Sequence, residues 1–137
     1  MDGGGQITIR FHVPGSVVPW ARAGRGGGFT FTPAPQRDYM ATIKQMASDA
    51  MLGKPPIDGP VTMKVVAVFP WPKSMSARKR ALPGAERKAS RPDLDNLVKI
   101  VKDALNLVVY SDDAQIADLH AWKKLGDRPG LTVEVLA

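Results

Sequence analysis

The feature that most constrains the fold is the apolar run VTMKVVAVF at residues 61–69. Strands buried on both faces read as nearly continuous apolar runs, whereas strands with one solvated face alternate between apolar and polar side chains. Pro55, Pro56 and Pro60 indicate a loop directly before the run. The run therefore predicts a strand in the centre of a β-sheet.

The other segments carry strand and helix patterns in a mixed order. Alternating side chains indicate half-buried strands, and apolar residues at helical spacing predict amphipathic helices. In chain order these patterns are a strand at 7–13, a glycine-rich flap and short strand at 24–32, helices at 36–52 and 94–108, and a terminal hairpin whose strands, 118–125 and 131–136, flank the turn GDRPG. This order predicts an α+β domain in which two helices pack on a mixed sheet.

The chain length of 137 residues suits one domain. We expect residues 1–5 to be a flexible leader and residues 6–137 to form the domain. The sequence has no cysteine, which excludes disulfides, thiolate zinc sites and a cysteine nucleophile. Its two histidines, His12 and His120, are too far apart in sequence to indicate a histidine-rich metal site. With no bilayer-spanning run and no signal-peptide pattern, we expect a soluble cytoplasmic protein without a membrane partner.

The net charge of +6 is concentrated in a basic loop at residues 71–92. Clustered cations can displace counterions together from a nucleic-acid backbone, although the same loop could simply be a solvated segment that confers solubility. No GxxxxGK[ST] motif and no strand-GxGxxG-helix unit is present, so we expect no nucleotide cofactor. The seven cations of the loop, against the single acid Glu86, are Lys73, Arg78, Lys79, Arg80, Arg87, Lys88 and Arg91.

Four aspartates flank the second predicted helix, in the stretch RPDLDNLVKIVKDALNLVVYSDD at residues 91–113. A structural interpretation is available, since Asp93 and Asp95 suit a helix N-terminus and Asp112 and Asp113 suit a turn. The functional alternative is a Mg²⁺ site, because Mg²⁺ prefers oxygen ligands and converging carboxylates repel unless a cation lies between them. Asp93 and Asp95 could converge only if Asp93 precedes the regular helix, and Asp113 must return along the helix through residues 107–110.

The motifs RPDLDN and DDAQI, with Lys99 and the acid of DAL between them, resemble the signature of RusA-like Holliday junction resolvases. The segments FHVPGSVVPWARAGR, FPWPKSMSARKR and LHAWKKLGDRPGLTVEV are also similar to that family, so the resemblance covers nearly the whole chain. Members of the family are small homodimeric endodeoxyribonucleases, bacterial or carried by phages and prophages. They cut four-way DNA junctions at symmetric points.

The resemblance implies roles for individual residues. Asp93, Asp95 and Asp113 would bind catalytic Mg²⁺, for which Mn²⁺ could substitute, and Lys99 would be the catalytic lysine. Asp103 and Asp112 would support these groups. The cations of the basic loop, with Arg22 and Arg25 of the glycine flap, would bind branched DNA, although the glycine-rich flap departs from the more polar segment of many relatives. Two other functions stay open, namely a metal-dependent nuclease of other branched nucleic acids and a non-catalytic, structure-selective DNA-binding module.

Overall fold

A mixed four-stranded sheet forms the centre of the structure, a computed structural model that describes residues 6–21, 24–26, 29–31 and 34–137. The spatial order of the strands is β1-β6-β4-β5; of the neighbouring pairs in this sheet, β4 and β5 are parallel and the other two are antiparallel. β4 is an interior strand, which confirms the prediction from the apolar run. The strands are β1 (Thr8–Pro14), β4 (Val61–Pro70), β5 (Ile116–Gly126) and β6 (Gly130–Leu136).

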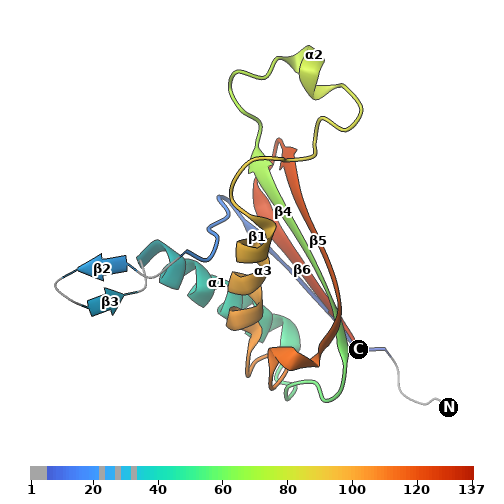
Figure 1. Ribbon diagram of the computed structural model, residues 1–137. Coiled ribbons are helices and arrows are strands. Elements are labelled where there is room, and N and C mark those ends of the chain that lie inside the picture. Colours follow the sequence, from blue (N-terminus) through green and yellow to red (C-terminus); the bar gives the residue numbers. More distant parts are fainter. Residues whose placement is uncertain (1–5, 22–23, 27–28, 32–33) are drawn as a thin grey trace.

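Two long helices lie on the same face of the sheet, α1 (Ala34–Met51) and α3 (Leu94–Leu105) (Figure 1). Their apolar sides and the inward-facing residues of β1, β4 and β6 form one buried core. Ile43 of α1 and Leu97 of α3 are fully buried in it. Both helices were predicted, but α3 ends three residues earlier than the apolar spacing suggested. The observed elements confirm the α+β class.

The predicted terminal hairpin is wrong, because β5 and β6 are not neighbours. They lie on opposite sides of β4, so residues 127–129 cross over the end of that strand. Two strand spacings are about 9.6 Å, a distance that three linking residues can span. Glycines flank the crossing because space is short there. A Cβ at Gly126 would lie 2.9 Å from Cγ1 of Val68, and one at Gly130 would lie 2.7 Å from Cε1 of His12.

The glycine flap contains a short antiparallel pair, β2 (Gly24–Gly26) and β3 (Phe29–Phe31). The sequence predicted β3 as a short strand, but it predicted the residues of β2 only as part of the flap. The leader expected at 1–5 lies outside the described residues, and so do Arg22 and the side chain of Arg25. The DNA-binding roles of these two arginines therefore stay predictions.

The basic loop projects beyond the end of β4 and carries a short helix, α2 (Ala77–Arg80), which the sequence had not suggested (Figure 1). Ser76 begins this helix, and its hydroxyl accepts a hydrogen bond from the Lys79 amide at 3.2 Å. The loop returns to the sheet where Arg87 pairs with Lys124 at the outer edge of β5. Among the described helices, none is long and apolar enough to cross a membrane.

Candidate active site

The polar side of α3 supplies most of the candidate site. Asp95, Lys99 and Asp103 are spaced four residues apart, so they share one side of the helix while its apolar side packs in the core. Asp95 and Asp103 are separated by about 12 Å along the axis at 1.5 Å per residue. The site is therefore elongated along the helix, with Lys99 between the two acids.

Asp113 lies on the same cavity, which has a volume of about 330 Å³. The chain turns back after α3 through Leu107, whose φ of 66° is in the left-handed region, and reaches the 3-10 helix η1 (Asp113–Gln115). This is the return that the sequence required but did not establish. The cavity is lined by Asp95, Val98, Lys99, Lys102, Asp103, Asp113 and Leu119. It thus brings together four of the acids and lysines that the sequence singled out.

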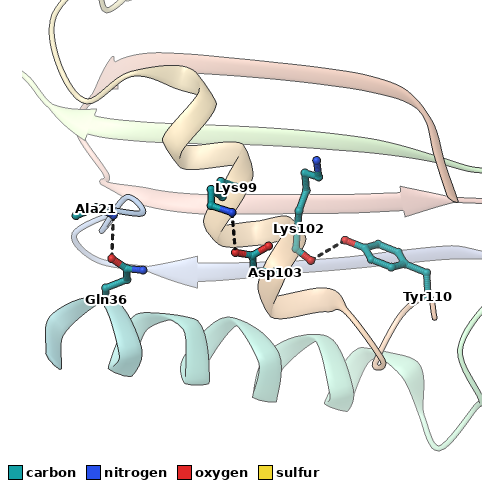
Figure 2. Close-up of polar contacts among 6 residues, drawn as sticks. All are labelled: Ala21, Gln36, Lys99, Lys102, Asp103 and Tyr110. Carbon is teal, nitrogen blue, oxygen red and sulfur yellow. Dashed lines mark hydrogen bonds and ion pairs between the residues drawn. The ribbon is translucent and has the colours of Figure 1, made fainter. Parts of the chain in front are cut away.

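Lys99 is held between an acid and an aromatic ring. Its Nζ lies 3.3 Å from a carboxylate oxygen of Asp103 (Figure 2). The same Nζ lies 5.1 Å from the ring centroid of Trp20. The Trp20 amide donates to the backbone carbonyl of Asn96 at 3.0 Å, which fixes the ring beside α3. These contacts keep the ammonium group on the side of α3 that faces the cavity.

A buried glutamine fixes the segment that carries Trp20. The Ala21 amide donates to Oε1 of Gln36 on α1 at 2.8 Å (Figure 2). Gln36 is only 4% exposed, so breaking this bond would leave a buried amide unpaired. The segment before the glycine flap is therefore attached to both long helices, and no pattern in the sequence indicated this attachment.

Asp112 and Asp113, which the sequence could not distinguish, have different surroundings. The Asp112 carboxylate accepts a hydrogen bond from the Ala114 amide at 3.0 Å, and with Gln115 it forms a reciprocal capping box at the start of η1. Asp113 instead lines the cavity. The structure thus gives Asp112 a local capping role and leaves Asp113 facing the cavity beside α3.

The pKa of the Tyr110 hydroxyl is affected by the negative charges of Asp113 and Asp103, which line the cavity. Its hydroxyl is buried and donates to the backbone carbonyl of Lys102 at 3.0 Å (Figure 2). Burial raises the pKa of Tyr110 far above its usual value, and the negative charges of Asp113 and then Asp103 raise it further. Asp113 and Asp103 are therefore close enough to act on the same phenol.

Asp93 lies apart from that cavity. Its backbone is extended, with φ −68° and ψ 141°, so it precedes the regular helix as convergence with Asp95 would require. Its side chain makes no capping hydrogen bond, which removes the simplest structural explanation for an aspartate at this position. It lines a second cavity of about 490 Å³ with Trp20 and Arg91. Both cavities adjoin the first turn of α3.

The oxygen donors fit a hard divalent cation, but they do not form a finished ligand sphere. Within the residues that the structure describes, no three acidic or histidine side chains are close enough to hold a metal ion together. Mg²⁺ usually takes only one or two protein carboxylates and completes its six ligands with water and substrate phosphate. The chemistry of Asp95, Asp113 and Asp93 therefore fits Mg²⁺ if nucleic-acid phosphate contributes the remaining oxygens.

The seven cations of the basic loop divide into two groups. Arg80 donates to the carbonyls of Met75 and Pro72 and lies over the Trp71 ring, so it stabilises the loop itself. Lys88 donates to the Ser90 hydroxyl and lies 5.1 Å from the Phe69 ring centroid. The other five are exposed to solvent: Lys73, Arg78, Lys79, Arg87 and Arg91.

These features define a small α+β domain in which an acidic cavity with a central lysine lies below a projecting basic loop. A family model described as endodeoxyribonuclease RusA matches residues 14–136. The chain belongs to this family, as its motifs indicated.

Two related proteins have similar sequences. Over 83 residues the chain is 43% identical to YqaN of Bacillus subtilis (strain 168), an uncharacterized protein, and the match covers 58% of each chain. Over 49 residues it is 45% identical to the crossover junction endodeoxyribonuclease rusA of Lactococcus phage r1t, a match that covers 35% of this chain and 37% of the phage protein. The matched segments therefore span less than two thirds of either relative.

Proposed function

We propose that the chain is a Mg²⁺-dependent endodeoxyribonuclease that resolves Holliday junctions by paired symmetric cleavage as a homodimer. The observation that carries the proposal is the shared cavity, which Asp95, Lys99 and Asp113 line together although Asp113 comes from a separate turn. Membership of the RusA family and the name of the phage relative support DNA junctions as the substrate. A four-way junction has two-fold symmetry, so two copies of the site related by a two-fold axis suit it.

The carboxylates of Asp95 and Asp113, with Asp93 at the adjacent turn, would hold Mg²⁺ against a phosphate of the junction. When bound there, Mg²⁺ supplies Lewis-acid stabilisation of the phosphate charge and activates water for attack. Two carboxylates brought to 4 Å would repel by roughly 4 kcal/mol at an effective dielectric of 20, so closing Asp95 and Asp113 on one phosphate would require a cation between them.

Lys99 would neutralise negative charge as it develops on the scissile phosphate. Asp103 keeps the ammonium group at the cavity until substrate arrives, and Trp20 limits where the group can move. The Lys99 side chain is 46% exposed, which leaves it accessible to a DNA strand. The exposed cations of the basic loop would bind the junction arms, because they lie at the end of the molecule beyond α3 (Figure 1).

The relatives of this chain come from a bacterium and a phage, and this supports a role for the protein in the bacterial cytoplasm, encoded by the host or by a prophage. DNA recombination and repair are the processes in which four-way junctions arise.

The deciding experiment compares an immobile four-way junction with a linear duplex of the same sequence, in Mg²⁺ and in EDTA. Paired symmetric nicks on the junction, absent in EDTA, are expected. Asp95→Asn should abolish the nicks and keep junction binding, whereas Asp49→Asn, on the exposed side of α1, should behave like the parent protein because Asn can still accept the bond from Gln45. Lys99→Gln should slow cleavage by about 100-fold or more, the usual effect of removing one group that stabilises developing charge.

Other results would assign a different function. Cleavage of flaps or forks in preference to the four-way junction would indicate a nuclease of other branched DNA. An intact junction in both Mg²⁺ and Mn²⁺, still bound by the protein, would indicate a non-catalytic, structure-selective binding module. The mass of the free protein and of its junction complex, measured by light scattering, tests the homodimer.

A further inference from the structure

Gln115 links the turn that carries Asp113 to the loop before β4. Its Oε1 accepts from the amides of Ser111 at 2.9 Å and Asp112 at 3.1 Å, and its Nε2 donates to the carbonyls of Ile57 at 2.7 Å and Gly59 at 2.9 Å. Both ends of the side-chain amide are thus used on backbone groups. The bonds join two segments more than 50 residues apart in sequence, and they set where the Asp113 turn lies relative to the sheet.

Lys123 links the turn that carries Asp93 to β5, near the C-terminal end of that strand. Its Nζ donates to the carbonyl of Ser90 at 2.8 Å and to the carbonyl of Pro92 at 3.0 Å, and Pro92 directly precedes Asp93. Lys123 lies on β5, on the side of the strand that faces the helices, and is partly buried. An ammonium group donating to neutral carbonyls is a charge-assisted contact, roughly twice as strong as a neutral hydrogen bond.

Gln115 therefore attaches the Asp113 turn to the loop before β4, and Lys123 attaches the Asp93 turn to β5. Neither side chain lines the cavity that contains Asp95 and Asp113. Each acts on the backbone within two or three residues of an acid, so each can set the position of a carboxylate without touching a ligand. The acids repel one another in the absence of a cation, and a flexible turn would let them separate.

We propose that Gln115 and Lys123 are positioning residues, which hold the two acidic turns at the spacing that divalent-metal binding needs. This inference rests on the proposed function, since it concerns the same acids. Partners that orient metal ligands typically change metal affinity or activity by 10- to 100-fold when removed. Loss of either residue should thus weaken metal binding by about 10-fold or more.

The test uses Gln115→Leu and Lys123→Met, which replace each side chain by an apolar one of similar bulk and remove its hydrogen bonds. Two matched controls change the same residue types at the surface: Gln45→Leu on α1, and Lys124→Met, the next residue of β5, whose side chain lies on the opposite face of the sheet. Lys123→Arg keeps a cationic donor and is expected to restore part of the affinity. The near-ultraviolet circular dichroism and the Tm of each variant report whether it is folded.

The first readout is Mn²⁺ binding to the full chain, followed by electron paramagnetic resonance. The second is the Mg²⁺ concentration that gives half-maximal junction cleavage. The Mn²⁺ dissociation constant and this Mg²⁺ concentration should both rise by about 10-fold in Gln115→Leu and Lys123→Met, with the cleavage rate returning towards the parent value at saturating Mg²⁺. Both should be unchanged in the controls.

Parent-like Mn²⁺ affinity and Mg²⁺ dependence in folded Gln115→Leu and Lys123→Met would overturn the inference, even if both variants had a lower Tm. Should Lys123→Met fail to fold, folded Gln115→Leu decides the inference, because parent-like metal affinity in that variant would overturn it and affinity weakened by about 10-fold would support it. The parent protein and Asp95→Asn test the proposed function separately. If the parent neither binds Mn²⁺ nor cuts the junction, the proposed function fails, and the positioning role fails with it.

Discussion

Neutralising two exposed cations of the basic loop should change the salt dependence of DNA binding by a defined amount. The structure leaves five of the seven loop cations free for phosphate, because Arg80 and Lys88 are engaged within the protein. Each phosphate contact on duplex DNA contributes about −0.9 to the slope of log affinity against log salt, so the expected slope is about −4.5 for each bound chain. Raising salt from 50 to 200 mM should then weaken binding by about 500-fold.

Arg78→Gln with Lys79→Gln removes two contacts on α2, so the slope should fall to about −2.7 and the loss of affinity over the same range to about 40-fold. Fluorescence anisotropy of a labelled junction arm in EDTA, repeated at several salt concentrations, measures both slopes without cleavage. The control is Lys44→Gln, an exposed position on α1 away from the loop, which should leave the slope at the parent value. Parallel salt plots for the parent and the double variant would refute a phosphate-binding role for these residues.

Four further expectations concern stability. Ile43→Ala, at a fully buried position, should lower the free energy of unfolding by about 2–5 kcal/mol in urea titrations, whereas Leu107→Ala, at a position 74% exposed, should change it far less. Tyr110→Phe loses the bond to the Lys102 carbonyl and should cost about 1 kcal/mol. Tyr39→Phe should be neutral or stabilising, because the buried Tyr39 hydroxyl has no partner among the described residues; a clear loss of stability would contradict this. Burial raises the pKa of Tyr39 from 10.0 to about 12, so folding disfavours the phenolate and stability falls as pH rises above 10. Tyr39→Phe should remove about 1.4 kcal/mol of the loss between pH 9 and pH 11, measured by urea titration at both values.

The sequence predicted the fold well where one segment determined its own structure. The apolar run of β4 and the periodicity of α1 and α3 reflect burial of each element, and burial is visible in the order of residues. The terminal hairpin failed because both flanking segments satisfy the strand pattern whichever partner they take. The crossing over β4 leaves no room for a Cβ at Gly126 or Gly130, so these glycines are its only sign in this part of the sequence. Glycines beside a turn indicate a hairpin equally well.

The sequence singled out the acids and the lysine of the candidate site. It did not indicate the residues that hold these side chains and their turns in place. Asp112 could have been separated from Asp113, since an aspartate followed three residues later by glutamine is a capping-box pattern. Gln115, Lys123 and Gln36 act through hydrogen bonds to distant backbone groups. Such bonds depend on where the chain returns in space, and no spacing in the sequence encodes that.

The basic loop is attached to the domain at two points, so its length can change without moving the acids. It leaves the sheet at the end of β4 and rejoins it where Arg87 pairs with Lys124, beside the Lys123 contact to Pro92. Residues inserted or deleted between these two attachment points would lengthen or shorten the projecting arm and leave the turn at Asp93 in place. The reach of this basic arm can therefore change through one surface segment without moving the acids beside α3.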